Sequence, residues 1–377
     1  MRVCILSPIH SYLDIRVFQK EALTLSDSGY EVYLIAQAPE NKTINNIQIV
    51  RAPSFNGRLK RFLLQPVILY KTLKINADVY HIHNPDTLLI GFLLKCMGKS
   101  IIYDTHEDFS KRILMREWIP IFLRKSIAKL VRFLEKCASK YFDSVIVTQP
   151  QMLLDLKGKS YLIENAPILH NELTEKAYEI SNTVIKDRNI VRLIYVGGIS
   201  STRGILELME VLSILNTSQP FRLWLIGQSF DKSFINKLKA TNGWKYVDFL
   251  GLLPQEEAFA YMIKSDIGLV TILDVGDHAT TSPNKLFEYQ RFGLPFVASN
   301  FSKWVSQVSK TGSGLFVDPL DIKDITSAIL KISTNPRFRE QMSKNGQKYI
   351  YQEFNWNLES EKLLNLYNEI IPMEVRK

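Results

Sequence analysis

One short segment in the last third of the chain combines residue types that bind phosphate with residue types that bind sugar hydroxyls. Ser282 is a favourable N-cap and Pro283 suits the first helical position, so a helix is expected to begin there. Its free N–H groups favour an anion. Asn284 and Lys285 share a helix face with Glu288, because they lie four and three residues before it. The combination indicates a nucleotide-sugar site, although a surface helix with an ordinary Lys–Glu pair has the same residues.

A glycine turn follows the expected strand 192–196. Gly197 and Gly198 allow the backbone to approach a ligand closely, and Arg203 behind them carries a planar donor fork that suits a diphosphate. Such turns are common after strands. Together with the helix that begins at Ser282, however, the turn favours a diphosphate site in the second half of the chain.

A histidine among acidic residues follows an expected strand in the first half of the chain. His106 can exchange protons near neutral pH. The acidic residues fit either a metal site or the acidic start of a helix, where carboxylates are favourable. They are Asp104, Glu107 and Asp108.

His81 and His83 alternate along an expected strand and therefore point to one face of the sheet. A metal-binding pair is one interpretation, and histidines satisfied within the core are the other. The chain contains no Asp-x-Asp motif, which argues against sugar transferases that hold the donor through a divalent metal. It also lacks a P-loop and a dinucleotide-binding glycine fingerprint, which disfavours P-loop ATPases and ordinary dinucleotide enzymes.

Strands and helices alternate in both halves of the chain, which indicates an α/β fold of two doubly wound, parallel-sheet domains facing each other across a cleft. We expect domains at 1–168 and 191–355, joined by a polar linker at 169–190. The expected strands are 3–6, 31–36, 47–51, 79–83, 101–104 and 144–148 in the first half, and 192–196, 222–226, 247–250, 267–270, 295–298 and 314–317 in the second.

Length and composition agree with two domains of an ordinary globular protein, because the 377 residues are 46% hydrophobic and 23% charged. The three cysteines have no metal-ligand spacing and fit a reducing cytoplasm. The N-terminal apolar run is too short for a signal peptide, and no apolar stretch approaches transmembrane length. We therefore expect a cytoplasmic protein.

The positive charge is concentrated in the first half, where residues 1–170 carry a net charge of +8 against +1 for residues 171–377. Residues 111–140 contribute nine cations, interleaved with Trp118 and aliphatic residues. A basic amphipathic segment can lie on an anionic membrane surface, form a solvated helix face or contact nucleic acid. We favour the membrane surface, which predicts a peripheral protein at the inner face of the cell membrane.

Several of these segments together resemble the family-four retaining glycosyltransferases of the GT-B fold, over nearly the whole chain. The similar segments are 14–22 with 28–32, His83–Asp86, Tyr103–Asp108, Glu288 with Gly293 and Pro295, and Asn355-Trp356 with the helix that follows. The resemblance implies that residues 356–377 form a C-terminal helix that returns to the first domain.

The resemblance also implies a role for each matching residue. Glu288 would hold the ribose hydroxyls of the donor. Arg203, with Lys285, would bind its diphosphate. His106 would lie beside the transferred sugar, and Gly251 near the nucleobase.

Two positions depart from the family pattern. The first glutamate of the family's paired motif is Thr280 here, which puts the contacts to the donor sugar in doubt. The arginine that usually follows the strand glycine is Gly198, so one phosphate cation is absent and Lys285 is expected to replace it.

We therefore expect a transferase that moves a sugar from a nucleotide diphosphate donor, UDP favoured and GDP possible, to a glycan or lipid-linked acceptor. The resemblance implies that configuration is retained and that no metal or other cofactor is needed. The alternatives are a nucleotide-sugar epimerase of the same architecture and a catalytically silent binding subunit of a polysaccharide-assembly complex.

Overall fold

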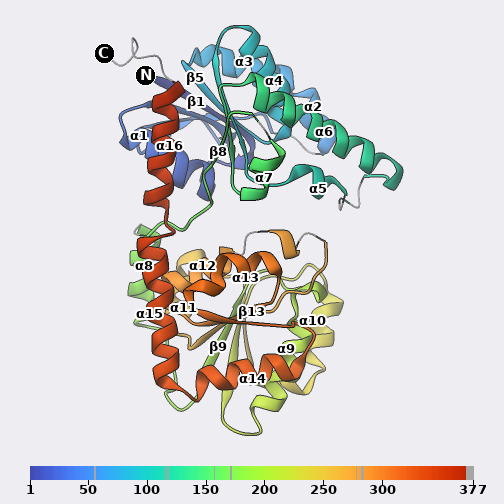
Figure 1. The fold of residues 1–377 in the computed structure, drawn as a ribbon, viewed down its shortest axis with the longest axis vertical. Coiled ribbons are helices and arrows are strands. Elements are labelled where there is room, and N and C mark those ends of the chain that lie inside the picture. The colour runs from blue at the N-terminus through green and yellow to red at the C-terminus, as the bar shows by residue number, and fades with distance from the viewer. Residues whose placement is uncertain are drawn as a thin grey trace. The chain divides into compact units, whose positions relative to one another are not determined.

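The computed structural model describes residues 1–54, 57–114, 116, 119–156, 158–169, 172–276, 278–281 and 284–370. The chain divides into two compact units, which are shown in Figure 1. The first unit contains Met1–Asn165 and Trp356–Lys377, and the second contains Ala166–Asn355. Helix α16 (Trp356–Ile370) thus belongs to the first unit, although it lies at the end of the chain.

The first unit is built on an eight-stranded sheet of order β3-β4-β2-β1-β5-β6-β7-β8. All neighbouring strands are parallel except the pair β3 and β4. The central strands are almost continuously buried, as expected for a parallel sheet covered on both faces. The strands are β1 (Arg2–Ser11), β2 (Glu31–Gln37), β3 (Lys42–Ile44), β4 (Ile47–Arg51), β5 (Val79–His83), β6 (Ser100–Thr105), β7 (Ser144–Val147) and β8 (Ser160–Leu162).

Helices α3, α4, α6 and α7 contribute side chains to one core with these strands. Helix α16 instead packs against η1, and its Trp356 Nε1 donates a hydrogen bond to Thr24 Oγ1 at 3.0 Å. The helical segments are η1 (Ile15–Ala22), α1 (Leu23–Asp27), α2 (Arg58–Leu63), α3 (Gln65–Ile75), η2 (Pro85–Thr87), α4 (Leu88–Cys96), α5 (Phe109–Leu114), α6 (Ile121–Tyr141) and α7 (Pro150–Asp155).

The first strand is longer than the expected segment 3–6. It continues to Ser11, and Ser7 Oγ lies 2.6 Å from His10 Nδ1. Polar residues of the strand thus pair with each other beyond its apolar part. The next helix begins at Ile15 as a π-helical turn, where the Asp14 side chain accepts hydrogen bonds from the N–H groups of Arg16 and Val17.

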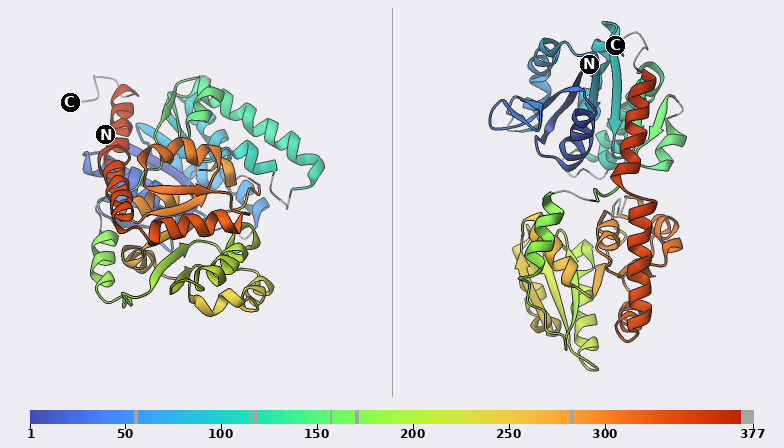
Figure 2. Two further views of the ribbon diagram at one scale, coloured as in Figure 1. Left: turned by 60° about the horizontal axis from the view of Figure 1, so that its bottom comes forward. Right: turned by 90° about the vertical axis from the view of Figure 1, so that its left-hand side faces the viewer.

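The second unit is built on a six-stranded parallel sheet of order β11-β10-β9-β12-β13-β14. This is the strand order of the doubly wound nucleotide-binding fold, in which the order reverses between the first and fourth strands. Two hydrophobic clusters fill the two faces of the sheet, and Figure 2 shows helices on both sides of it. The strands are β9 (Val191–Val196), β10 (Phe221–Ile226), β11 (Val247–Gly251), β12 (Ile267–Val270), β13 (Phe296–Ser299) and β14 (Gly314–Val317).

The helical segments of the second unit alternate with its strands. They are α8 (Glu172–Ser181), η3 (Ser201–Arg203), α9 (Ile205–Leu215), α10 (Lys232–Lys239), η4 (Asn242–Tyr246), α11 (Gln255–Lys264), η5 (His278–Thr280), α12 (Asn284–Arg291), α13 (Ser302–Val308), η6 (Ser309–Thr311), α14 (Ile322–Ser333) and α15 (Pro336–Gln352).

The segment 169–190, expected as a linker, contains a packed helix. Helix α8 contacts α11, and the buried Ala177 joins the core that includes Phe259 and Met262. Arg291 Nη2 also donates a hydrogen bond to Leu169 O at 2.8 Å. The segment therefore belongs to the second unit. Its polar residues cover the solvent side of a helix, which the polarity of the sequence alone does not distinguish from a linker.

One sheet that is parallel except at its edge pair β3–β4 and one fully parallel sheet, each with helices, confirm the expected α/β class with two doubly wound domains. Among the described residues, no helix combines the length and the apolar character that crossing a membrane requires.

Candidate active-site residues

The carboxyl ends of the central strands of the first unit meet at one edge of the sheet, where β1 and β5 lie at the reversal of strand order. His83 ends β5, and Asp104 lies opposite it near the end of β6. His106 follows β6 by one residue. The structure thus brings together the histidines and the first acidic residue that the sequence singled out.

A buried arginine, which the sequence prediction did not include, organises this edge. Arg16 Nη2 lies 2.6 Å from Asp104 Oδ2, and Arg16 Nε lies 3.0 Å from Glu21 Oε1. Burial opposes ionisation of Asp104, but Arg16 and the neighbouring His106 and His83 together outweigh burial and hold the pKa of that carboxyl well below its usual range. Burial, reinforced by the charge of Asp104, raises the pKa of Glu21 well above its ordinary value. Asp104 is therefore the carboxyl that ionises more readily beside Arg16, and Glu21 is the one that keeps its proton more readily.

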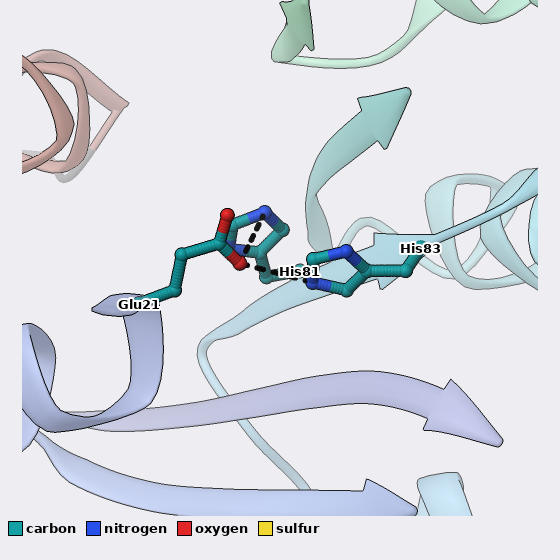
Figure 3. A group of neighbouring side chains, drawn as sticks. All are labelled: Glu21, His81 and His83. Carbon is teal, nitrogen blue, oxygen red and sulfur yellow. Dashed lines mark ion pairs between the residues drawn. The ribbon is translucent and has the colours of Figure 1, made fainter. Parts of the chain in front are cut away.

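His81 and His83 point to one face of the sheet, as predicted from their alternation along one strand, and both lie against Glu21 (Figure 3). Their rings stack with centroids 4.8 Å apart, and His83 Nε2 lies 3.2 Å from Glu21 Oε2. His81 Nδ1 lies 3.0 Å from the Tyr367 hydroxyl of α16. Burial lowers the pKa of His81 to about 4, and burial with repulsion from His81 lowers the pKa of His83 well below its usual value. Burial thus favours the neutral form of both rings.

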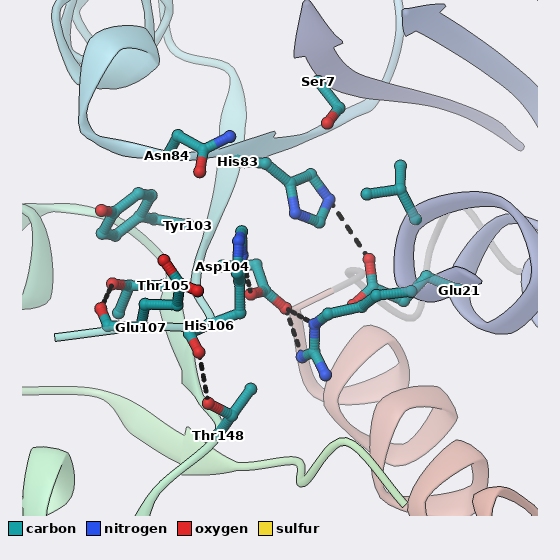
Figure 4. Close-up of polar contacts among 12 residues, drawn as sticks. Ser7, Glu21, His83, Asn84, Tyr103, Asp104, Thr105, His106, Glu107 and Thr148 are labelled. Atoms are coloured by element: carbon teal, nitrogen blue, oxygen red, sulfur yellow. Dashed lines mark hydrogen bonds and ion pairs between the residues drawn. The ribbon is translucent and has the colours of Figure 1, made fainter. Parts of the chain in front are cut away.

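His106 differs from its neighbours because its side chain is 19% exposed, whereas those of His81 and His83 are fully buried. Its Nδ1 lies 3.7 Å from Asp104 Oδ1, and its carbonyl oxygen accepts a 2.8 Å hydrogen bond from Thr148 Oγ1 (Figure 4). His106 is thus held by its backbone and by a charged carboxylate while part of the ring reaches the surface.

The two other acidic residues beside His106 serve the start of helix α5. Asp108 accepts hydrogen bonds from Ser110 Oγ at 2.7 Å and from the N–H of Lys111 at 3.1 Å. Glu107 forms an ion pair with Arg112. For these two residues the structure favours the helix-start interpretation over a metal site.

Among the residues that the structure describes, two groups of side chains could hold a metal ion. The ligand atoms of Glu21, His81 and His83 lie within 4.8 Å of one another, as do those of His83, Asp104 and His106. Two imidazoles and a carboxylate form a ligand set that Zn²⁺ accepts. Arg16 places a fixed positive charge beside both carboxylates, which opposes a cation there. That the protein works without a metal stays a prediction.

In the second unit, the glycine turn after β9 is held by backbone geometry. Gly204 has φ +69°, and a Cβ atom there would lie 1.7 Å from Thr271 O, so only glycine fits this approach. The N–H of Leu273 donates to Thr202 O at 3.0 Å, which fixes η3 against the segment that follows β12. Arg203, partly exposed, ends η3 at the carboxyl edge of the sheet.

Gly198 and Gly251 leave open space at the ends of β9 and β11, because a Cβ atom at either would meet nothing within 4 Å. Gly251 has φ +70°, and its carbonyl accepts a 2.7 Å hydrogen bond from the N–H of Gly227. Both glycines are therefore compatible with a ligand that lies against the backbone.

Helix α12 carries the predicted cation and carboxylate on one face. Lys285 Nζ lies 2.6 Å from Glu288 Oε2, with exposed side-chain fractions of 34% and 19%. Asn284 is exposed at the start of the helix. Ser282, the expected N-cap, lies outside the described residues. Thr280, at the position of the missing glutamate, is exposed, and its carbonyl accepts a 2.7 Å hydrogen bond from Lys303 Nζ.

The sequence prediction missed Arg16 and Glu21 as members of the histidine cluster. Both are charged residues of η1, among the buried Val17, Phe18 and Ala22. Charged residues on an otherwise buried helix face must find buried partners, and this signal could have indicated them.

Comparisons with known proteins agree with this division of the chain. Residues 16–162 match the model "Glycosyltransferase Family 4", and residues 176–349 match "Glycosyl transferases group 1". The capsular polysaccharide biosynthesis glycosyltransferase CapM of Staphylococcus aureus is 25% identical over 206 residues, which cover 54% of this chain and 50% of CapM. The matched segment thus spans about half the length of that relative.

Solved structures share the fold at lower identity. Sucrose-phosphate synthase from Thermosynechococcus elongatus is 20% identical, with a TM-score of 0.74 and 98% of each chain covered. HepE from Anabaena, solved with UDP and glucose, is 12% identical, with a TM-score of 0.67 over 98% of this chain and 100% of that one. The two domain models, the two parallel sheets and these neighbours lead to one conclusion: the chain belongs to the family-four glycosyltransferases of the GT-B fold.

Proposed function

We propose that this protein transfers a sugar from a nucleotide diphosphate donor to a glycan or lipid-linked acceptor, with retention of configuration and without a metal. The observation that carries the proposal is the carboxyl edge of the second sheet, where the open glycine turn and Arg203 belong to the same unit as the partly exposed Lys285 and Glu288. Cations and a carboxylate at this edge suit a diphosphate and its sugar hydroxyls.

Each residue has a proposed role. Glu288 holds the ribose hydroxyls, which replace Lys285 as the partner of its carboxylate when the donor binds. Lys285 and Arg203 stabilise the diphosphate as it leaves, together with the N-terminus of α12. Gly198, Gly251, Ser282 and Asn284 line the donor, and His106 acts on the sugar or acceptor. UDP is the favoured nucleotide and GDP the alternative; the UDP complex of HepE supports this choice.

The acceptor belongs to polysaccharide or glycolipid synthesis at the inner face of the cell membrane. The capsular role of CapM supports this proposal. Helix α6 also exposes apolar side chains beside its cations: Ile121 and Phe122 are each 78% exposed. Exposed apolar residues next to basic ones favour peripheral binding to anionic lipid, and no nucleic acid partner is proposed.

The test is incubation with UDP- and GDP-sugars in the presence of EDTA, followed by measurement of released nucleotide. We expect slow release of UDP, or of GDP, without acceptor, and the chelator should not reduce it. Full loss of release in EDTA that manganese or magnesium restores would overturn metal independence. An epimerised sugar nucleotide as the product would identify an epimerase instead. No release with any donor, with binding intact, would identify a silent binding subunit, as the departures at Gly198 and Thr280 allow.

Membrane binding has its own test, co-sedimentation with anionic liposomes. A variant with Arg124, Lys125, Lys129 and Arg132 changed to Gln should pellet less than the wild type, and salt should weaken the binding of the wild type. If both proteins pellet equally, the basic segment is a solvated helix face and does not bind the membrane.

A further inference from the structure

Buried polar atoms that make no hydrogen bond gather at the carboxyl edge of the first sheet. Among the described residues, none is a hydrogen-bond partner for Nδ1 of His83, Oδ1 of Asp104 or Nδ1 of His106. The side chains of His83 and Asp104 are fully buried. Because a buried polar group without a partner costs free energy, these atoms together indicate a ligand that the chain itself does not supply.

The three residues have the types and the spacing that a zinc ion requires. Their ligand atoms lie within 4.8 Å of one another. Imidazole nitrogens with a carboxylate suit Zn²⁺, whereas Mg²⁺ and Ca²⁺ prefer oxygen ligands. Ligands of one tetrahedral Zn²⁺ lie about 3.3 Å apart. Asp104 Oδ1 is already 3.7 Å from His106 Nδ1, so small side-chain rotations would close the ligands around an ion.

Neighbouring groups hold these ligands in place. His83 Nε2 lies 3.2 Å from Glu21 Oε2, and the His83 ring lies between Glu21 and the pair Asp104 and His106 (Figure 4). Metal-binding histidines commonly place their second ring nitrogen against a carboxyl group or carbonyl, which fixes the ring. Glu21 is positioned to do this for His83. The Thr148 hydroxyl does the corresponding work at the His106 backbone, whose carbonyl accepts its hydrogen bond at 2.8 Å.

Arg16 sets the strength of the site. Its Nε and Nη2 donate to Asp104 Oδ2 at 3.2 Å and 2.6 Å, and so leave Oδ1 for an ion. The positive charge of Arg16 repels a cation at this distance. Zn²⁺ should therefore bind reversibly, as a regulator does, and not as a resident cofactor.

The neighbouring group of Glu21, His81 and His83 is less suited to the ion. Its three side chains are at most 1% exposed, and His81 Nδ1 already lies 3.0 Å from the Tyr367 hydroxyl. His106, which is 19% exposed, gives the other group a route from solvent. The ion is thus expected at His106.

We propose that His83, Asp104 and His106 form a reversible, inhibitory Zn²⁺ site. The ion would occupy the imidazole that acts on the sugar or acceptor, and the donor residues of the second unit would stay free. Binding follows from the geometry alone, whereas inhibition rests on the proposed function, in which His106 has that role. A transferase that needs no metal can still be inhibited by zinc, because the ion competes with the chemistry of His106.

The first experiment titrates Zn²⁺ into the chelator-treated protein by calorimetry and repeats the titration with Co²⁺, whose visible spectrum reports the ligand geometry. His106→Gln removes the partly exposed ligand. The controls are His278→Gln, a partly exposed histidine of the second unit, and Cys96→Ser, an exposed thiol. We expect affinity to fall at least about tenfold in His106→Gln and less than about twofold in each control. No zinc binding by the wild type, or equal affinity in His106→Gln, would overturn the proposal.

A second variant separates the two neighbouring groups of ligands. His81 belongs only to the group with Glu21, so His81→Gln should keep zinc affinity within about twofold of the wild type. Retention of binding in His106→Gln, with its loss in His81→Gln, would place the ion in the neighbouring group and overturn the assignment.

The third experiment measures nucleotide release from the donor with and without Zn²⁺. We expect zinc to lower the rate at least about tenfold, EDTA to restore it, and Mg²⁺ at the same concentration to have no effect. The fractional inhibition should be much smaller in His83→Gln, which lacks one ligand. Equal inhibition of both proteins would show that zinc acts on the donor and would overturn the inhibitory role. Absence of release from the metal-free wild type would instead count against the transferase, and calorimetry would still decide zinc binding.

Discussion

The carboxyl edges of the two sheets carry polar residues in contrasting states. In the first unit, the side chains of Arg16, Glu21 and Asp104 are at most 7% exposed and contact one another. In the second unit, the corresponding edge offers an ion pair, Lys285 with Glu288, that is 34% and 19% exposed. One edge is a closed network, and the other is open to solvent.

The difference in burial indicates that the two edges have different roles. A buried ion pair is costly to break, because removal of one partner leaves an uncompensated charge in the interior. A half-exposed pair contributes little to stability and can exchange its partner for a ligand. We infer that the first edge fixes the positions of its histidines, whereas the second edge supplies the groups that bind the donor.

The largest expected effect concerns His106, the partly exposed member of the closed network. His106→Ala should lower turnover about 10²- to 10⁴-fold while nucleotide affinity stays near that of the wild type, since positioned acid–base and hydrogen-bonding groups contribute on this scale. Steady-state turnover and calorimetric nucleotide binding check both parts. Near wild-type turnover would mean that His106 and the network around it have only a structural role.

Removing the cation from each ion pair should lower the free energy of unfolding much more at the first edge than at the second. Arg16→Met leaves Asp104 buried without its 2.6 Å partner and should cost about 3–5 kcal/mol of unfolding free energy. The matched change Lys285→Met removes a half-exposed partner and should cost about 1 kcal/mol or less. Calorimetric melting of both variants gives the comparison, and similar losses would mean that the two pairs do not differ in kind.

Glu135, a buried carboxyl in the first unit, should make the stability of the protein depend on pH. Burial raises the pKa of Glu135 from 4.5 to about 7, and its Oε1 accepts hydrogen bonds from Tyr103 and Thr105. Between these pH values the folded state holds a proton that the unfolded state has lost, so stability falls as pH rises toward 7, by about 3 kcal/mol.

Glu135→Gln keeps the shape of the side chain and removes this titration. The variant should therefore gain stability relative to the wild type at pH 8 but not at pH 4.5. Melting temperatures of the two proteins at both pH values provide the check, and a difference that does not change with pH would contradict a raised pKa.

A substitution at the exposed edge of the second sheet should change donor affinity rather than the stability of the fold. Glu288→Ala should reduce donor affinity at least about tenfold, because a lost hydrogen bond to a charged group costs about 1.5–3 kcal/mol. The melting temperature should change little, since Glu288 is partly exposed. Equilibrium titration with the donor and with free nucleotide diphosphate tests this expectation, and unchanged affinity in the folded variant would remove Glu288 from the site.

The sequence predicted the parts of this comparison that depend on local pattern. Polar residues in the last positions of apolar strands, such as His83 and Asp104, lie at one edge of the sheet because parallel strands finish at a common edge. Lys285 and Glu288 form the pair that their helical spacing predicts. Both predictions needed only the period of the secondary structure.

Other features depend on which strands become neighbours. Arg16 and Asp104 are 88 residues apart, and their contact depends on β6 lying two strands from β1, which η1 follows. Their pairing therefore cannot be predicted from spacing. The segment containing α8 looked like a linker because its buried side consists of small residues, such as Ala177, that give a weak hydrophobic signal.

The most direct test of the account is a calorimetric titration of UDP and uridine, with GDP and guanosine in parallel, into the wild type and Arg203→Ala. The account predicts that the wild type binds at least one nucleoside diphosphate, and that Arg203→Ala weakens this binding about tenfold while the nucleoside is affected less than about twofold. Equal weakening of diphosphate and nucleoside, or no binding of either diphosphate by the wild type, would contradict a donor site at the open edge of the second sheet.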